Sequence, residues 1–304
     1  MNVLSLFDGI SAGQVALNRA GIKYSNYYAS EVDKHAISIT QYNYPKTIQL
    51  GDVKNWKSWK LNSMNGTIDL IFAGSPCVDL SSSKQNRKGL NGNNSSLFYY
   101  FVDILNAYNP RYFFFENVAS MRREDRDKIS ELLGCQPFTI NSATTTALNR
   151  PRLYWTNITD KIVIPPKNIF VSDILQPDSE IESKYYLSQR AKDRLEIINH
   201  RANSKGLGYK DCIIDSLNDS KFLCLDANYF KGPDGKRSVL LTDDLRNATP
   251  LECERLMTLP DDYTKFGLTT DKKVLQIADT NRYRAIGNSW SVDIVVEFLK
   301  KINN

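Results

Sequence analysis

The stretch IDLIFAGSPC, residues 68–77, indicates how this chain is built. Its first six residues form a mostly apolar run, typical of a buried strand, and Pro76 then blocks further ladder pairing and forces a loop. Cys77 is therefore expected at the carboxyl end of a strand, where open α/β folds bind their ligands. A lone cysteine in a tight turn is more often a half-buried structural residue, so the surrounding sequence must decide between the two interpretations.

Strand-like and helix-like segments alternate on both sides of this stretch. We expect further strands at 2–7, 25–31, 46–52 and 111–117, and helices at 14–21, 33–44 and 96–108. This alternation predicts an α/β fold with a doubly wound, mostly parallel sheet. The predicted domains are a catalytic and cofactor-binding domain at 1–165, a smaller lobe of loops and short strands at 166–245, and a return to the first domain at 246–304.

The composition is that of an ordinary globular protein. The 304 residues are 41% hydrophobic and 24% charged, with a net charge of +5. No apolar run reaches the length of a membrane span, and the N-terminus lacks the basic region of a secretory signal, so we expect a cytoplasmic protein. The five cysteines are scattered without CxxC spacing, which argues against a disulfide framework and against a zinc site; no metal is expected.

Polar residues follow several predicted strands. The loop LFDGISAG contains Gly9 and Gly13, which let main-chain amides face a ligand. Glu31 ends the second strand, where an acid suits ribose hydroxyls, and Asp52 ends the third. Each acid taken alone is equally well a solvated residue at a strand end.

Two later motifs add chemical groups. In FFFEN, Glu116 follows a run of aromatic residues, and in NRPRLYW, Arg150 and Arg152 lie two apart on a probable strand. Period-two geometry predicts that both arginines share one face, where they could hold a phosphate or a base carbonyl. A solvent-exposed edge strand is the simpler interpretation of the arginine pair in isolation.

The motifs in order resemble the DNA cytosine-5 methyltransferase family. They are LFDGISAG, SEVD, GDV, GSPC, FENV, RPRLYW and AIGNSWSV, over residues 3–157 and about 246–300. Among the branches of this family, the motifs are most similar to those of the eukaryotic de novo branch, through VLSLFDGI, GSPC-x-DLS, RKGL and SWSV. Val78 stands where many relatives have glutamine, and Val32 replaces an aromatic residue often found after the ribose-binding acid.

The resemblance implies an enzyme with the class I S-adenosylmethionine-dependent methyltransferase fold. Such an enzyme methylates carbon-5 of a cytosine flipped out of duplex DNA at a specific short sequence. Cys77 would attack carbon-6, Glu116 would hydrogen-bond ring nitrogen-3, Arg152 would contact the O2 carbonyl, and Arg150 would support the site. The implied cofactor residues are Phe7, Asp8, Gly9, Gly13, Glu31, Val32, Asp52, Val53, Gly74, Pro76, Leu97, Asn288 and Ser289.

The resemblance also implies how DNA is held. The implied DNA-binding residues are Ser81, Lys84, Arg87, Lys88, Lys231 and Arg237. Residues 166–245 would recognise the target sequence, with Lys205, Lys210, Lys221 and Lys236 as further candidates. The partner is double-stranded DNA. We expect a monomer, and a cognate restriction endonuclease, if one exists, would act separately.

Three other functions remain open at this point. A tRNA cytosine-5 methyltransferase shares these motifs, although the Cys-Phe-Thr signature typical of that branch is absent from the sequence. A catalytically silent DNA-binding homologue usually loses the cysteine or the glutamate, and both are present here. A nicotinamide oxidoreductase would explain the sheet and Glu31 but not Cys77, Glu116 and the arginines together. The sequence recognised by the smaller lobe does not follow from its residues.

Overall fold

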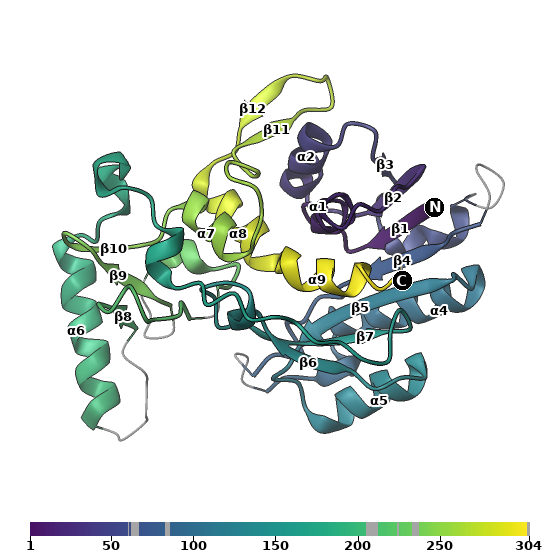
Figure 1. Ribbon diagram of the computed structural model, residues 1–304, viewed down its shortest axis with the longest axis horizontal. Helices are drawn as coiled ribbons and strands as arrows, with labels where there is room; N and C mark the ends of the chain where they lie inside the picture. The colour runs from purple at the N-terminus through teal and green to yellow at the C-terminus, as the bar shows by residue number, and fades with distance from the viewer. Residues whose placement is uncertain are drawn as a thin grey trace.

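The computed structural model consists of a large lobe and a smaller lobe beside it (Figure 1). It describes residues 1–59, 61, 67–82, 86–204, 212–223, 225–232 and 237–302. Within these residues, no helix is both long and apolar enough to cross a membrane.

A seven-stranded sheet forms the centre of the large lobe. Its order is β3-β2-β1-β4-β5-β7-β6, and the first five of these strands are parallel, while β7 runs antiparallel to both of its neighbours. The strands are β1 (Asn2–Leu6), β2 (Asn26–Ser30), β3 (Ile48–Gln49), β4 (Leu70–Ala73), β5 (Tyr112–Val118), β6 (Phe138–Asn141) and β7 (Pro151–Thr156). The predicted α/β fold with a mostly parallel sheet is confirmed.

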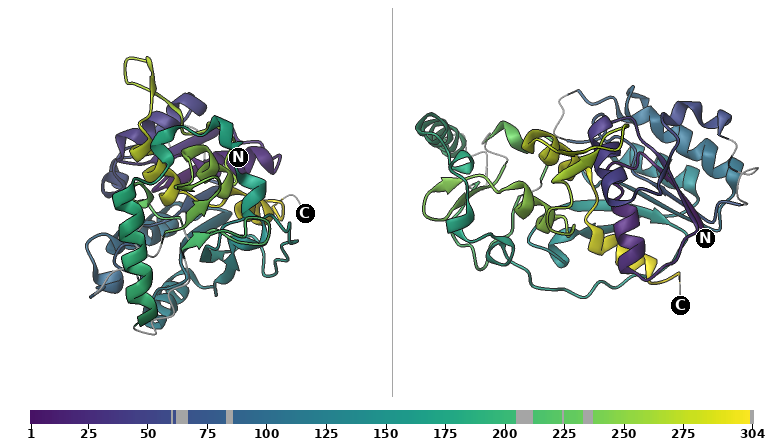
Figure 2. Two further views of the ribbon diagram at one scale, coloured as in Figure 1. Left: turned by 90° about the vertical axis from the view of Figure 1, so that its left-hand side faces the viewer. Right: turned by 90° about the horizontal axis from the view of Figure 1, so that it is seen from above.

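Helices cover both faces of this sheet (Figures 1 and 2). One face carries α1 (Ala12–Arg19), α2 (Lys34–Asn43) and α9 (Val292–Leu299), and the other carries α4 (Phe98–Tyr108) and α5 (Arg123–Leu133). The aromatic run of β5 serves both faces, because Phe114 packs in one core cluster while Phe113 and Phe115 pack in the other. A central parallel strand is buried on both sides and so reads as a continuous apolar run.

The smaller lobe contains a three-stranded sheet and one long helix. Its strands are β8 (Ile213–Ile214), β9 (Val239–Leu241) and β10 (Leu245–Arg246), and its helix is α6 (Gln189–Ser204). The prediction of loops and short strands missed α6. That helix is largely polar and rests on the lobe through few apolar residues, chiefly Ala191 and the buried Leu195. Its sequence nevertheless repeats apolar residues at helical spacing, at Ala191, Leu195, Ile198 and Ala202, and this signal was overlooked among the many polar residues.

The chain then returns to the large lobe. This part contains α7 (Pro250–Leu256), the hairpin of β11 (Phe266–Leu268) and β12 (Val274–Gln276), and α8 (Asp279–Asn288). Thr249 and Glu252 form a capping box at the start of α7, a pattern that the residues themselves display. Glu252 also accepts two hydrogen bonds from Arg246 of β10, at 2.8 and 2.9 Å, in a fully buried ion pair that fastens the smaller lobe to α7.

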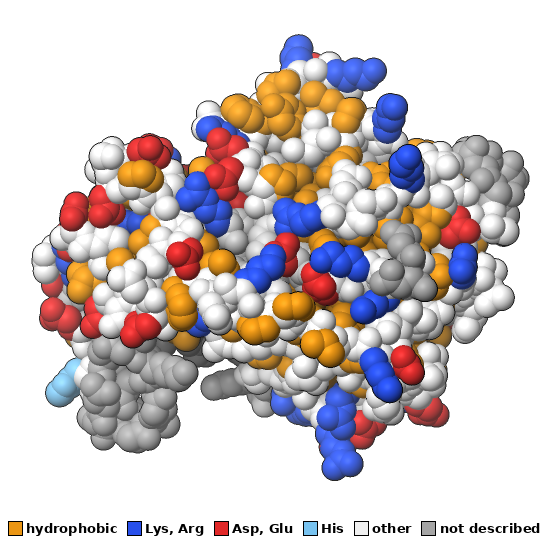
Figure 3. Space-filling view, viewed as in Figure 1, with side chains coloured by type: hydrophobic (Ala, Val, Ile, Leu, Met, Phe, Trp, Pro, Cys, Tyr) orange, Lys and Arg blue, Asp and Glu red, His pale blue; other side chains and the backbone are white. Residues whose placement is uncertain are grey.

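Charge is unevenly distributed over the face shown in Figure 3. Basic side chains spread over the middle of that face, while acidic side chains gather at the edge formed by the smaller lobe. The uniformly basic surface of a non-specific DNA-binding protein is not seen on this face.

Candidate active site

The parallel strands bring the predicted site residues to one edge of the sheet. Strands β1, β2, β4 and β5 end at that edge, so the loops that follow them converge there. Strand β7 runs the opposite way and begins at the same edge, with Arg152 opposite Val118. Segments 7–9, 31–32, 74–77 and 150–152 are thereby brought together from distant parts of the chain.

The loop after β1 has an unusual main-chain shape held by Glu31. Phe7 and Gly9 have positive φ values of 57° and 59°. One carboxylate oxygen of Glu31 accepts the Gly9 amide at 2.8 Å, and the other accepts the amides of Val32 and Asp33 at 2.7 and 2.9 Å. The second strand end therefore fixes the first loop, which leaves the glutamate at the position expected for a ribose contact.

Gly13 plays a different part from the one expected. It lies inside α1 rather than in the turn, and a Cβ atom there would lie 2.8 Å from Tyr27 Oη and 3.0 Å from the Phe72 ring. Gly13 thus permits α1 to pack closely on the sheet. Beside it, Asp8 accepts a hydrogen bond from Tyr27 Oη at 2.8 Å. Burial raises the pKa of Asp8 to about 6, against the opposing effect of its hydrogen bonds.

The remaining cofactor candidates differ in how exposed their side chains are. Asp52 caps a short 3-10 helix by accepting the Lys54 amide at 3.0 Å, and Val53 behind it is buried. Val32 is 66% exposed and offers an open apolar surface. Leu97 is partly buried against the core on the α4 side of the sheet.

Ser289 supplies a test of whether a cofactor fits here. Its side chain is buried, and its hydroxyl has no hydrogen-bond partner among the described residues, whereas Asn288 beside it is exposed. A buried polar atom without a partner is costly in a finished structure. The hydroxyl, together with the Glu31 carboxylate, suits a polar ligand such as S-adenosylmethionine at this edge.

The loop that carries Cys77 is tied down on both sides. Gly74 passes so close to Trp290 that a Cβ atom would lie 2.9 Å from the indole nitrogen. Asn117 donates its amide to the Ser75 carbonyl at 3.1 Å, and Ser95 donates its hydroxyl to the Pro76 carbonyl at 3.2 Å. The position of Cys77 is therefore set by β5 and by the segment before α4 as well as by its own turn.

Glu116 and Arg152 form an ion pair beside this loop. Arg152 Nε lies 2.9 Å from Glu116 Oε1, and the two side chains are 12% and 13% exposed. The register pairs Glu116 with Tyr154 and Val118 with Arg152, so the two residues are diagonal neighbours on one face of adjacent strands. Such a pair presents a guanidinium donor and a carboxylate on one edge.

Both charges act on the thiol of Cys77. Burial raises the pKa of Cys77, and the nearby Glu116 carboxylate raises it further, while Arg152 and Arg150 oppose that rise. This raised pKa keeps the Cys77 thiol mostly protonated at neutral pH, so a nucleophilic role requires the loss of that proton.

Arg150 has different hydrogen-bond partners from Arg152. It immediately precedes β7, is 5% exposed, and donates to the carbonyls of Leu225, Gly287 and Ser289 at 2.7, 3.1 and 2.9 Å. Its charge nevertheless acts on Cys77 together with that of Arg152, as expected for two arginines near one site. The strand is also interior rather than an exposed edge.

Two of the arginines predicted to bind DNA brace the protein itself. Arg87 donates to the carbonyls of Leu80 and Ser120 at 2.9 and 2.6 Å, and so holds the segment after Cys77 against the turn after β5. Arg237 pairs with Asp226 at 3.2 Å and is only 12% exposed.

The other predicted DNA contacts are placed variously. Lys221 also turns inward, donating to the carbonyls of Thr146 and Ile169. Lys88 is exposed, Ser81 is partly buried near Cys77, and Lys231 lies over the Phe230 ring at 5.8 Å. Lys84, Lys205, Lys210 and Lys236 lie outside the described residues.

Two residues that matter to this site were not singled out from the sequence. Asp79 is buried, and its carboxylate accepts the Asn94 amide at 3.2 Å, which ties the residues just after Cys77 to the segment before α4. Trp290 packs against Phe72 and Phe114 at centroid distances of 5.6 Å and supports Gly74. The signals for these two residues were their places in the motifs GSPC-x-DLS and SWSV.

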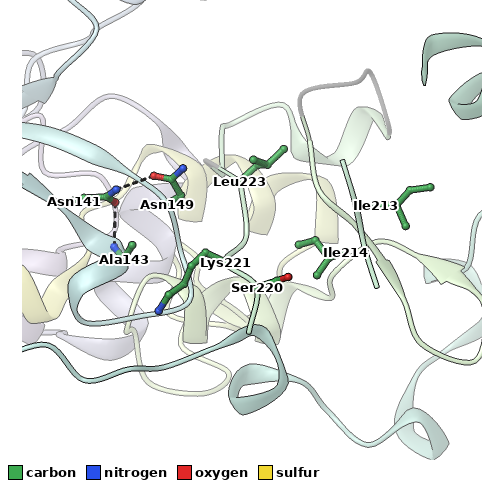
Figure 4. Close-up of a pocket in the computed structure, with 8 residues that line it drawn as sticks. All are labelled: Asn141, Ala143, Asn149, Ile213, Ile214, Ser220, Lys221 and Leu223. Atoms are coloured by element: carbon green, nitrogen blue, oxygen red, sulfur yellow. Dashed lines mark hydrogen bonds between the residues drawn. The ribbon is translucent and has the colours of Figure 1, made fainter. Parts of the chain in front are cut away.

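Two cavities lie outside the group of residues described above. The larger, of about 420 Å³, is at the boundary of the lobes and is lined by residues of both (Figure 4), namely Asn141, Ala143, Asn149, Ile213, Ile214, Ser220, Lys221 and Leu223. A smaller one of about 200 Å³ is bounded by Tyr185, Tyr229 and Tyr283 with Asp279. The described residues contain no group of three His, Cys, Asp or Glu side chains placed to hold a metal.

Comparison with known proteins identifies cytosine-5 DNA methyltransferases as similar to this chain. The family model described as C-5 cytosine-specific DNA methylase matches residues 1–133 and 149–304. The type II methyltransferase M.DsaV of Dactylococcopsis salina is 26% identical, over 99% of this chain and 86% of its own length. The orphan methyltransferase M.Rho11sI of Bacillus phage rho11s is 36% identical over 41% of this chain, a region that spans only 24% of the phage protein.

Solved structures share the fold. The methyltransferase EhMeth of Entamoeba histolytica superimposes with a TM-score of 0.72 at 18% sequence identity, over 99% of this chain and 97% of that one. At this identity the likeness concerns the arrangement of helices and strands.

Proposed function

The chain belongs to the C-5 cytosine-specific DNA methylase family, and from this premise we propose that it transfers a methyl group from S-adenosylmethionine to carbon-5 of cytosine in duplex DNA. The observation that carries the proposal is the convergence of Cys77, Glu116 and Arg152 at the carboxyl edge of the sheet. The 26% identity to a type II DNA methyltransferase over nearly the whole chain supports DNA as the substrate.

Carbon-5 of cytosine is a weak nucleophile, and the proposed roles address that difficulty. The thiolate of Cys77 adds to carbon-6, which makes carbon-5 able to take the methyl group. Glu116, protonated in the complex, donates a hydrogen bond to ring nitrogen-3 and draws electron density away from carbon-6, while Arg152 donates to the O2 carbonyl. After methyl transfer, loss of the carbon-5 proton expels the thiolate and restores the ring.

The ion pair of Glu116 and Arg152 supports these roles. Nitrogen-3 and O2 are adjacent atoms on one edge of cytosine, and the pair presents its two groups side by side on one face. Because the pair is nearly buried at the sheet edge, a cytosine stacked inside a duplex cannot reach it. We therefore propose that the base is flipped out of the helix.

The ribose and amino-acid portions of the cofactor would be held by main-chain and side-chain groups already described. Glu31 would bind the ribose hydroxyls, Asp52 would face the adenine, and Ser289 would use its unpartnered hydroxyl. Bound S-adenosylmethionine supplies an electrophilic methyl group. Phe7, Asp8, Gly9, Gly13, Val53, Gly74, Pro76 and Leu97 would shape or support this pocket.

We place target recognition in residues 166–245 and phosphate contacts at Ser81, Lys88 and Lys231. We further propose that the protein acts as a cytoplasmic monomer, with any cognate restriction endonuclease a separate protein. Arg87 and Arg237 would contribute by holding loops in place, as their internal contacts indicate.

The test compares duplex DNA with tRNA. The protein is expressed in a host without cytosine methylation, its DNA is mapped by bisulfite sequencing, and purified protein is incubated with duplexes carrying 5-fluorocytosine at the mapped target. We expect methylation at one short motif and a covalent complex through Cys77, because fluorine replaces the proton that must leave carbon-5. Methylation of tRNA alone, or trapping through Cys135, Cys212, Cys224 or Cys253, would contradict the proposal.

A further inference from the structure

Three hydrogen bonds from one buried guanidinium join the two lobes. Arg150 Nη1 donates to the carbonyl of Leu225 in the smaller lobe, at 2.7 Å. Its Nη2 donates to the carbonyls of Gly287 and Ser289, at the end of α8, at 3.1 and 2.9 Å. These partners are 75, 137 and 139 residues away along the chain, so the contact exists only while both lobes are seated.

The main chains of the two lobes touch directly at this point. A Cβ atom on Gly287 would lie 2.4 Å from the carbonyl carbon of Asp226 and 2.5 Å from the amide nitrogen of Ala227. Just upstream, Phe222 exchanges main-chain hydrogen bonds with Ala147 at 2.6 Å and with Asn149 at 2.8 Å. Phe222 and residues 225–227 are thereby held between the loop before β7 and the end of α8.

The same guanidinium lies close to the groups proposed for catalysis. Only Pro151 separates Arg150 from Arg152, whose ion pair with Glu116 is described above. The Arg150 amide is fixed by Asn141 Oδ1 at 2.8 Å, and Ser289, one of its acceptors, belongs to the proposed cofactor pocket. Movement of this part of the smaller lobe would therefore displace the start of β7 and the wall of the proposed cofactor pocket.

We propose that Arg150 is a positioning residue that couples the seating of the target-recognition lobe to the geometry of Arg152 and Glu116. It rests on the proposed function and refines it, because it says how Arg150 supports the site. A lobe seated on its correct target keeps the three hydrogen bonds and holds Arg152 in line. A lobe on the wrong sequence shifts Leu225 and leaves the guanidinium without that acceptor.

The shape of the guanidinium suits this role. Its planar fork reaches acceptors on two elements at once, whereas a lysine ammonium is a single point and cannot satisfy the same three carbonyls in one position. The cavity of about 420 Å³ beside the junction, which residues of both lobes line, provides open space in which segment 213–223 can move (Figure 4).

The test uses two variants of the junction, each with a matched control. Arg150→Lys removes the fork, and Arg255→Lys removes a guanidinium of α7 that donates to the carbonyls of Ile174 and Leu175 at a second contact between residues 166–245 and the large lobe. Gly287→Ala forces the main chains apart, and Gly267→Ala adds a methyl group that meets the movable side chains of Ser38 and Ile277 instead. Rates are measured on the duplex carrying the mapped target and on duplexes with one base pair of that target changed.

We expect Arg150→Lys to lower kcat on the correct duplex by about 10- to 100-fold, the cost of misplacing a catalytic group by a fraction of an ångström to one ångström. Rates on the altered duplexes should fall by less, so the discrimination ratio shrinks. The affinity for S-adenosylmethionine and the Tm should stay close to those of Arg255→Lys. Gly287→Ala should reproduce the smaller ratio, and Gly267→Ala should not.

Several results would overturn the coupling. An equal loss on correct and altered duplexes would mean that Arg150 contacts the cytosine itself. A loss of cofactor affinity and Tm beyond that of the control would mean that it only supports the fold, and unchanged rates would mean that it does neither.

Hydrogen exchange of the DNA-free protein gives an independent readout. Arg150→Lys should speed amide exchange in peptides that contain Leu225–Tyr229, without changing β1 or α1, and unchanged exchange there would refute the junction. This arm separates the two proposals, because failure of the wild type to methylate DNA would refute the proposed function while exchange still decides whether Arg150 holds the lobe.

Discussion

Replacing Asp8 with asparagine should stabilise the protein at neutral pH and not in acid. The carboxyl group of Asp8 lies at the start of the loop after β1, where it accepts hydrogen bonds from Ser11 Oγ and Tyr27 Oη. Burial raises the pKa of Asp8 from 3.8 to about 6, and the nearby Glu31 charge adds to the rise, although hydrogen bonds from Ser11, Ser5 and Tyr27 oppose it.

The sign and size of the effect follow from proton linkage. A carboxyl group with a raised pKa binds its proton more tightly in the folded state, so it contributes stability below pH 3.8 that is lost as the pH rises through 6. At about 1.4 kcal/mol for each tenfold change in proton affinity, the loss amounts to at most about 3 kcal/mol. Asparagine has nearly the same shape and no charge, so it does not suffer this loss.

Urea unfolding of the wild type and of Asp8→Asn, at several values between pH 3.5 and 7.5, measures the effect. We expect the variant to gain stability relative to the wild type by up to about 3 kcal/mol across that range. Asp160→Asn, at an exposed position, controls for the change in net charge. If the difference in stability between Asp8→Asn and the wild type stays constant with pH, the argument that burial raises the pKa of Asp8 is refuted.

Three further predictions concern the reaction. Cys77→Ser should abolish methyl transfer while calorimetry still detects S-adenosylmethionine binding, because a hydroxyl is a far weaker nucleophile and the cofactor is held by other strand ends; normal turnover would exclude a covalent role. Glu116→Gln should slow methyl transfer by about 10²–10⁴-fold with little change in DNA affinity. It should also speed alkylation of Cys77 by iodoacetamide, since the Glu116 charge raises the pKa of that thiol, and slower alkylation would count against this electrostatic picture. Alanine scanning of residues 166–245, read by genome-wide methylation mapping, should shift the methylated motif, at about 1–3 kcal/mol of discrimination for each lost base contact; a motif that shifts only with changes at 78–95 would place recognition in the loop after Cys77.

Some elements follow directly from local sequence. The apolar runs of β1, β4 and β5 are recognisable because a strand buried on both faces has no polar positions to interrupt it. The start of α7 is equally local, since Thr249 and Glu252 satisfy main-chain groups within three residues of each other. Helix α6 escaped prediction because polar residues dominate it, although Ala191, Leu195, Ile198 and Ala202 repeat at helical spacing.

The sequence alone was enough to predict which residues meet at the edge of the sheet that carries the candidate active site. Parallel strands end on the same side of a sheet, so Glu31, Cys77 and Glu116 could be brought together from strand order alone. What each long cationic side chain does there was decided only by the tertiary structure. Arg152 finds a carboxylate on the neighbouring strand, whereas Arg150 finds main-chain carbonyls 75 to 139 residues away. No local pattern encodes such partners, because a carbonyl group is present at every residue and only the packed lobes select which of them lie within reach.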